Sequence, residues 1–218
     1  MRISAVLLLT GLSAALLSGC GQDDHAAGSS GSDRASGDAS GQCTYTATGD
    51  AARKVDLPPS DPAPARSATI TTNRGPIGVT LDADAAPCTA GSFTSLARQG
   101  YFDDTKCHRL TTQGIFVLQC GDPTGTGSGG PGYSFDDELS GQETYPAGTL
   151  AMANAGPSTN GSQFFLVYAD TSLPPAYTVF GKLDAAGTKV VLDIAKKGTA
   201  DGSGDGAPQQ DVVITSVK

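Results

Sequence analysis

From residue 66 onwards, apolar and polar positions alternate in short runs that glycine, proline, asparagine or aspartate interrupt. The run SATITTNRGPIGVTLDADAAP begins at Ser67 and alternates on both sides of the turn signal Asn73-Arg74-Gly75-Pro76, which predicts a β-hairpin. Further short strands are predicted over residues 106–110, 114–122, 149–155, 162–169, 177–183 and 210–217.

Two stretches follow the helical period instead. Phe93, Leu96 and Ala97 fall at helical spacing in PCTAGSFTSLARQGY. Pro87 stands near the start of that stretch and Gly100 provides a stop. A second helix is predicted over TKVVLDIAKKG, residues 188–198. Many short strands with two helices predict an all-β barrel or sandwich.

The first twenty residues have the pattern of an export signal. Arg2 precedes an apolar run from Ile3 to Leu17 that is too short for an ordinary transmembrane span, so residues 1–19 are predicted to be a signal peptide. The ending LSGC fits the bacterial lipobox, in which the cysteine, here Cys20, is lipidated and becomes the first residue of the mature protein. A plain signal peptide cleaved elsewhere is the alternative. Acyl chains on Cys20 would anchor the protein, so we expect an extracytoplasmic lipoprotein held at the cell membrane.

Residues 20–42 and 43–65 lack the apolar pattern of a domain. The first stretch is rich in Gly, Ser, Ala and Asp and cannot bury enough surface to offset its ordering entropy, which predicts a flexible linker. The second contains LPPSDPAPA and predicts a stiff, extended lead-in. Residues 66–218 are then expected to form the folded domain.

Composition narrows the class of protein. The chain has 218 residues with 38% hydrophobic residues, 29 Gly and 13 Pro, which fits a loop-rich soluble domain better than a helical one. The net charge of −8 argues against nucleic acid as a partner, because phosphate binding needs clustered Lys and Arg. With Cys20 lipidated, an even number of cysteines remains, which suits disulfides in an oxidising compartment. Three pairings stay open, with reduced, buried thiols as the alternative, for Cys43, Cys88, Cys107 and Cys120.

Three motifs resemble ligand sites without meeting the full requirements. GTGSGG at 125–130 has the spacing of a dinucleotide-binding loop, but no βαβ unit surrounds it, which favours a glycine-rich surface loop. DGSGDG at 201–206 resembles the start of a calcium loop, but Val212 occupies the position where Glu is required, which favours a solvated turn. Asn160-Gly161-Ser162 is formally a glycosylation sequon, and the Asn-Gly pair favours a turn. We expect no metal and no cofactor.

Arg109, Gln119 and Gln163 are polar residues on short predicted strands that could pair into one sheet. Alternation places Gln163 and Phe165 on one face, with Phe164 on the opposite face. Such a sheet would set a guanidinium and two amides beside an apolar ring. The domain's single histidine adjoins Arg109 and points to the other face, so hydrolytic triads and paired-carboxylate mechanisms lack their residues.

These residues lie in segments that resemble the cyclophilins, the cyclosporin-binding family of peptidyl-prolyl cis-trans isomerases. LAMANAGPSTNGSQFF, residues 150–165, is similar to the family's central motif almost residue for residue. The segments HRL, FVLQCGDPTGTGSGGPGYSFDDE and TVFGKL resemble further family motifs, and the resemblance covers about residues 66–218. It implies an eight-stranded antiparallel β-barrel closed by two α-helices, with the substrate groove on the outer surface.

The resemblance also implies a role for each candidate residue. Arg109 is the donor to the prolyl nitrogen and the principal catalytic residue. Gln163 orients Arg109 and the substrate, and Gln119 supports the same network. Ala153 and Asn154 hold the peptide backbone through main-chain groups. Phe165 is the apolar ring of the catalytic group, and the proline pocket is expected to consist of Phe116, Val117, Phe165, Leu173 and Tyr177.

Departures from the family pattern concern the pocket. Two extra residues separate Arg109 from Phe116, and Val117 stands where the family usually has Met. The family's usual Trp beside Leu173 is missing, and Tyr177 stands where His is common. That Trp takes part in cyclosporin binding in the family, so we expect weak cyclosporin sensitivity.

Two functions from different classes remain. The leading hypothesis is a peptidyl-prolyl isomerase, monomeric and without cofactor, that acts on proline-containing unfolded or exported polypeptides. The alternative is a non-catalytic proline-peptide binding or chaperone module on the cell surface. Arg109 favours the enzyme, because degenerate members of the resembling family often lose this residue.

Overall fold

The computed structural model describes residues 42–49 and 51–218. The predicted signal peptide, Cys20 and the predicted linker up to residue 41 lie outside these ranges. Within the described ranges, no helix combines the length and apolar character needed to span a bilayer.

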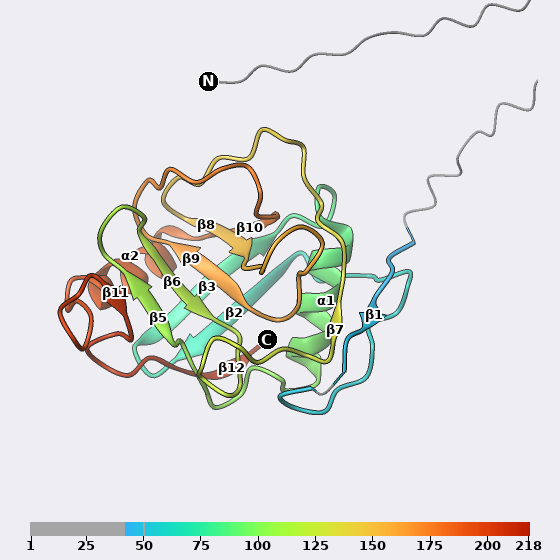
Figure 1. Ribbon diagram of the computed structural model, residues 1–218, viewed down its shortest axis with the longest axis horizontal. Coiled ribbons are helices and arrows are strands. Elements are labelled where there is room, and N and C mark those ends of the chain that lie inside the picture. Colours follow the sequence, from blue (N-terminus) through green and yellow to red (C-terminus); the bar gives the residue numbers. More distant parts are fainter. Residues whose placement is uncertain (1–41, 50) are drawn as a thin grey trace, which may run out of the picture. The chain divides into compact units, whose positions relative to one another are not determined.

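A ten-stranded antiparallel sheet forms most of the domain (Figure 1). Its strand order is β11-β5-β6-β9-β8-β10-β3-β2-β12-β4. The bounds are β2 (Ser67–Thr72), β3 (Gly75–Leu81), β4 (Thr105–Lys106), β5 (Arg109–Thr111), β6 (Val117–Cys120), β8 (Thr149–Met152), β9 (Phe164–Val167), β10 (Val179–Leu183), β11 (Asp205–Gly206) and β12 (Val213–Val217). A separate two-stranded sheet pairs β1 (Thr46–Ala47) with β7 (Tyr133–Ser134). The all-β class is confirmed, and so is the predicted hairpin, which is β2 and β3.

The strand count differs from the eight that the family resemblance implied. Two of the ten strands, β4 and β11, have only two residues each. β4 pairs with β12, whereas β5 pairs with β6, and both lie on the continuous segment 105–111. The last strand of the order, β4, and the second, β5, therefore lie on one segment, and the sheet curls on itself.

Two helices pack against this sheet and lie at opposite ends of it in Figure 1. The first, α1 (Pro87–Arg98), begins at the predicted proline and ends just before Gly100, whose φ of 66° suits glycine. The second, α2 (Ala185–Ala195), begins three residues before the predicted start because Asp184 caps it by accepting from the Gly187 amide. Both predicted helices are therefore confirmed, with both ends of α2 three residues earlier than predicted.

The sheet carries two separate apolar clusters. The larger one contains Phe164 together with apolar residues of both helices, such as Phe93 and Ile194. The smaller cluster has five buried members, Val117, Tyr145, Ala151, Phe165 and Val167. Adjacent residues of β9 thus enter different clusters, as the alternation of strand side chains predicted for Phe164 and Phe165. We call the face with the smaller cluster the outer face.

Covalent and polar contacts tie residues within 42–49 and 51–66 to α1 and to the turn that follows it. A disulfide joins Cys43 to Cys88 in α1, and a second disulfide joins Cys107 to Cys120. The Arg53 guanidinium donates through Nη1 to three carbonyls just after α1, those of residues 100, 101 and 103, at 2.8, 2.9 and 2.8 Å. Of the three disulfide pairings that the sequence left open, the structure has Cys43 with Cys88 and Cys107 with Cys120.

Candidate active site

A row of side chains crosses the outer face of the sheet. Arg109 on β5 lies opposite Gln119 on β6, and Gln119 lies opposite Phe165 on β9. Phe165 in turn lies opposite Ala151 on β8. Directly opposed residues of antiparallel strands point to the same face, so register alone sets the guanidinium, the amide and the ring side by side.

A pocket of about 190 Å³ opens beside this row. Its wall combines the Arg109 guanidinium with the Phe165 ring and with residues from the loop that follows β9. The Phe165 and Tyr177 rings meet edge to face, with centroids 5.6 Å apart. The lining residues are Arg109, Ile115, Val117, Gln119, Ala153, Asn154, Phe165, Leu173 and Tyr177.

The structure thus brings all but two of the predicted catalytic and substrate-binding residues into one pocket. Phe116 does not line this pocket: its partly buried ring packs against the larger core cluster, 6.0 Å from the ring of Tyr168. Val117 faces the pocket, and strand alternation turns Phe116 to the other side, so Ile115 takes the wall position. Gln163 is the second exception: it does not line the pocket but contacts the pocket residue Gln119.

Arg109 is held by two partners. Its Nε and Nη2 donate to the two carboxylate oxygens of Asp205 at 2.7 and 2.8 Å, and its Nη1 donates to Gln119 Oε1 at 3.3 Å. The hydrogen bond to Asp205 raises the pKa of Arg109, and the same contact lowers the pKa of Asp205. The guanidinium is therefore a permanent cation, although 39% of its side chain remains exposed.

The two amides form a relay behind Arg109. Gln119 Nε2 donates to Gln163 Oε1 at 2.9 Å. Gln163 Nε2 donates to the carbonyls of Gly127 and Gly129 at 2.9 and 3.0 Å. Gln119, rather than Gln163, is therefore the amide that touches Arg109 directly, which reverses the predicted order of the network.

The glycine-rich loop at 125–130 is organised by Asp122, a buried residue that sequence reasoning missed. The Asp122 carboxylate accepts hydrogen bonds from the amides of Thr124, Gly127 and Gly129 at 2.7, 2.7 and 3.0 Å. Burial alone would raise the pKa of Asp122, but these hydrogen bonds outweigh it and lower the pKa. An aspartate followed by glycines is the signal for such a loop, in which one carboxylate satisfies several backbone amides.

Tyr145 is a second missed residue, and it holds the far wall of the pocket. Its buried hydroxyl accepts from the Tyr177 amide at 3.0 Å and lies 3.0 Å from the Tyr177 carbonyl, to which it donates. Its ring belongs to the same outer-face cluster as Phe165. Asn154 adds a further tie, because its Nδ2 donates to the Ala176 carbonyl at 2.8 Å.

The calcium-like motif at 201–206 and the sequon at 160–162 are both engaged in structural contacts. The calcium-like motif is a largely exposed turn after α2, as predicted, and its Asp205 also accepts hydrogen bonds from Arg109. In the described part of the chain, no three His, Cys, Asp or Glu side chains gather as a metal site would require. Asn160 of the sequon is fully buried and donates to Asp137 at 2.7 Å; it forms a β-bridge with Phe135 instead of the predicted turn.

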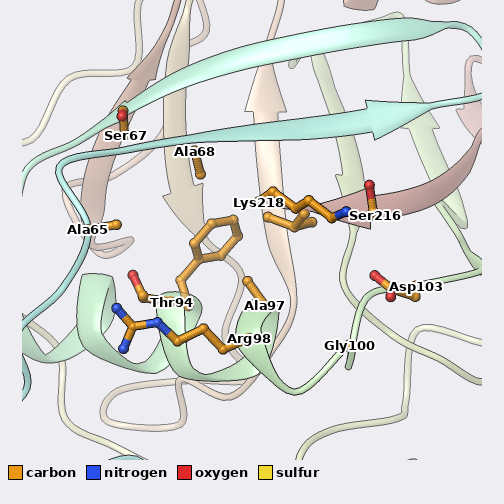
Figure 2. A pocket seen from close by; sticks show the side chains of 12 residues that line it. Ala65, Ser67, Ala68, Thr94, Ala97, Arg98, Gly100, Asp103, Ser216 and Lys218 are labelled. Atoms are coloured by element: carbon orange, nitrogen blue, oxygen red, sulfur yellow. The ribbon is translucent and has the colours of Figure 1, made fainter.

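Three larger hollows lie at other parts of the described domain, and two of them bear on the choice of site. One, of about 570 Å³, shares Gln119, Ala153 and Asn154 with it and extends along the glycine-rich loop to Thr48. Figure 2 shows the other, of about 320 Å³, between α1 and the C-terminal residues, with Ala97, Arg98 and Lys218 around it. Its lining includes none of the predicted site residues, so the candidate site is the pocket at Arg109 with its extension.

Comparisons with known proteins place this arrangement in a family. Residues 67–218 match the family described as cyclophilin type peptidyl-prolyl cis-trans isomerase/CLD. A Mycobacterium tuberculosis protein called probable peptidyl-prolyl cis-trans isomerase B is 51% identical over 194 residues, which cover 80% of this chain and 63% of that protein. The Mycobacterium leprae protein of the same name is 49% identical over 195 residues, covering 81% and 66%.

Solved structures agree with this match. A Cryptosporidium parvum cyclophilin type peptidyl-prolyl cis-trans isomerase superposes with a TM-score of 0.61 at 34% identity, covering 70% of this chain and 95% of that one. A second crystal structure of that protein, in the presence of the dipeptide Ala-Pro, gives 0.60. The chain spans less than two thirds of the length of the two mycobacterial relatives. With the family match extending over most of the described domain, the chain belongs to the cyclophilin-type peptidyl-prolyl cis-trans isomerases.

Proposed function

We propose that this chain is an active peptidyl-prolyl cis-trans isomerase and that the reaction takes place in the pocket at Arg109. Family membership supports the activity, and the relatives named above carry the same description. The observation that carries the proposal is the arrangement of Arg109, Gln119 and Phe165 in one row over an open pocket.

The reaction requires modest stabilisation and no covalent step. An X-Pro bond isomerises over a barrier of about 20 kcal/mol, because the amide C–N bond has partial double-bond character. Shortening tens of seconds to milliseconds takes about four factors of ten, or about 5 kcal/mol of differential stabilisation. An environment that favours the twisted amide over both planar forms supplies it.

The pocket offers what the twisted amide needs. When conjugation is lost, the prolyl nitrogen regains its lone pair and becomes a good hydrogen-bond acceptor. A guanidinium has five N–H groups, and three of those in Arg109 are engaged by Asp205 and Gln119, which leaves two for the substrate. The Phe165 ring and Leu173 provide the apolar surface on which a pyrrolidine ring can rest.

The wider setting is part of the same proposal. We infer that lipidated Cys20 anchors the protein outside the cell membrane and that exported, proline-containing polypeptides are its substrates. The support is the export-signal pattern of the sequence and the two disulfides, which persist in oxidising compartments. We also infer that β4 and β5 act as one strand, so that eight strands close a barrel and β11 lies on its rim.

The test is a peptide isomerisation assay that compares the wild type with Arg109→Ala. Arg66→Ala is the matched control, because Arg66 also pairs with an aspartate, Asp84, and lies on the surface away from the pocket. We expect Arg109→Ala to lose most of the activity and Arg66→Ala to keep it. Equally negligible rates for all three proteins would favour the non-catalytic binding module, and an unchanged Arg109→Ala rate would remove Arg109 from the mechanism.

A further inference from the structure

A short strand from a distant part of the chain covers the edge of β5. β11 pairs with β5 in antiparallel register, with Asp205 opposite Thr111 and Gly206 opposite Leu110. Figure 1 shows β11 next to β5, with the chain continuing from there towards β12. Arg109 stands two residues from Thr111, so it is the diagonal, same-face neighbour of Asp205.

The contact between Asp205 and Arg109 is a two-point contact. Nε and Nη2 lie on one edge of the guanidinium and face the two carboxylate oxygens at 2.7 and 2.8 Å. Among the five ion pairs of the described ranges, this pair has the least exposed cation, at 39% against 58% or more for the others. Bidentate geometry fixes the plane of the guanidinium as well as its position.

The loop that carries Asp205 is itself anchored to the sheet. The Gly204 carbonyl accepts from the Thr112 amide at 2.7 Å, and the Gly204 amide donates to the buried Thr199 hydroxyl at 3.2 Å. Asp201, the other carboxylate of this loop, accepts from Ser203 instead. Asp205 therefore approaches Arg109 from a fixed direction.

From these contacts we propose that Asp205 is a positioning residue for the isomerase reaction. It holds the guanidinium by the edge that faces away from the pocket, so that the two unengaged N–H groups of Arg109 point to the substrate nitrogen. Without it, Arg109 keeps one longer hydrogen bond, at 3.3 Å to Gln119, and its terminal torsions become free. This proposal rests on the isomerase activity proposed above.

The proposal predicts a loss of turnover with little loss of binding. We expect Asp205→Ala to lower kcat about fivefold, the factor that one favourable partly exposed ion pair supplies, with KM for the peptide changed less than twofold. Asp205→Asn keeps an oxygen that can accept from one N–H and is expected to lie between Asp205→Ala and the wild type. The control Asp211→Asn removes the same charge from the Lys106 ion pair and should leave both parameters unchanged.

Two readouts separate positioning from a merely structural effect. Sodium formate offers a free carboxylate to the vacated guanidinium edge, so it should raise the rate of Asp205→Ala, whereas sodium chloride at the same ionic strength should not. In a protease-free NMR exchange assay, the wild-type rate should fall in acid as the Asp205 carboxylate is protonated, and Asp205→Ala should lack that step.

The possible outcomes separate the positioning role of Asp205 from the isomerase function itself. Wild-type kcat in Asp205→Ala, with Arg109→Ala inactive, would overturn the proposal and leave the isomerase function intact. A fall in kcat matched by Asp211→Asn would show a general charge effect and also overturn it. If Asp205→Ala fails to fold, Asp205→Asn provides the test: it also lacks the titrating carboxylate, so it should show a lower kcat and no acid step. An inactive wild type would overturn both proposals.

Discussion

The disulfide between Cys43 and Cys88 should contribute a large part of the domain's stability. It closes a segment of 45 residues and ties the lead-in to α1. In the chain-entropy description, a loop of this length is worth about 4 kcal/mol at 25 °C. The disulfide between Cys107 and Cys120 closes only 13 residues, for which the same relation gives about 3 kcal/mol.

The perturbation is the double substitution Cys43→Ala/Cys88→Ala. Alanine avoids placing a polar hydroxyl at position 43, which is buried. The lead-in keeps the three Arg53 hydrogen bonds, so the folded structure should persist while the unfolded chain gains freedom. For a domain of this size, about 4 kcal/mol corresponds to a fall in Tm of about 8 to 16 °C.

The assay is thermal and urea unfolding with and without a reducing agent, together with the peptide isomerisation rate at 25 °C. We expect the reducing agent to lower the Tm of the wild type, and to lower that of the double variant less because one disulfide is already gone. The rate should be retained, since no lead-in residue lines the pocket around Arg109 and the lead-in reaches its extension only at Thr48. A Tm unchanged by the substitution would refute the loop-closure reasoning, and a lost rate in folded protein would refute the separation of lead-in and site.

Three other predictions concern the pocket wall, the pH dependence of stability and the response to cyclosporin. Tyr145→Phe leaves the amide and carbonyl of Tyr177 without their partner, which should cost about 1–3 kcal/mol in urea unfolding and raise KM; an unchanged KM would show that the wall does not depend on this hydroxyl. Burial lowers the pKa of His108, so the unfolded chain takes up the proton first and stability should fall as the pH drops through about 6.5. His108→Leu should flatten that slope between pH 7.5 and 5.5 in urea titrations, and an identical slope would exclude His108 as its source. Cyclosporin should inhibit only weakly, and a nanomolar inhibition constant would contradict the expectation drawn from the missing Trp.

Much of the local structure could be predicted from the sequence. The turn signal at Asn73 and Arg74 and the alternation around it were enough for the hairpin of β2 and β3. Proline at position 87 marked the start of α1, and the two-residue period separated Phe164 from Phe165. These features depend on interactions between residues a few positions apart, which a linear pattern contains.

The remaining features depended on the tertiary structure. Nothing in the local pattern relates Asp205 to Arg109, because 96 positions separate them and the contact exists only through the pairing of β11 with β5. Phe116 was expected in the pocket from the family motif, whereas its ring, just before β6, packs against the larger core cluster. Sequence periodicity determines which face a residue occupies within its own element. Strand register and side-chain packing decide which distant groups share that face, and so which residues can hold a catalytic guanidinium in place.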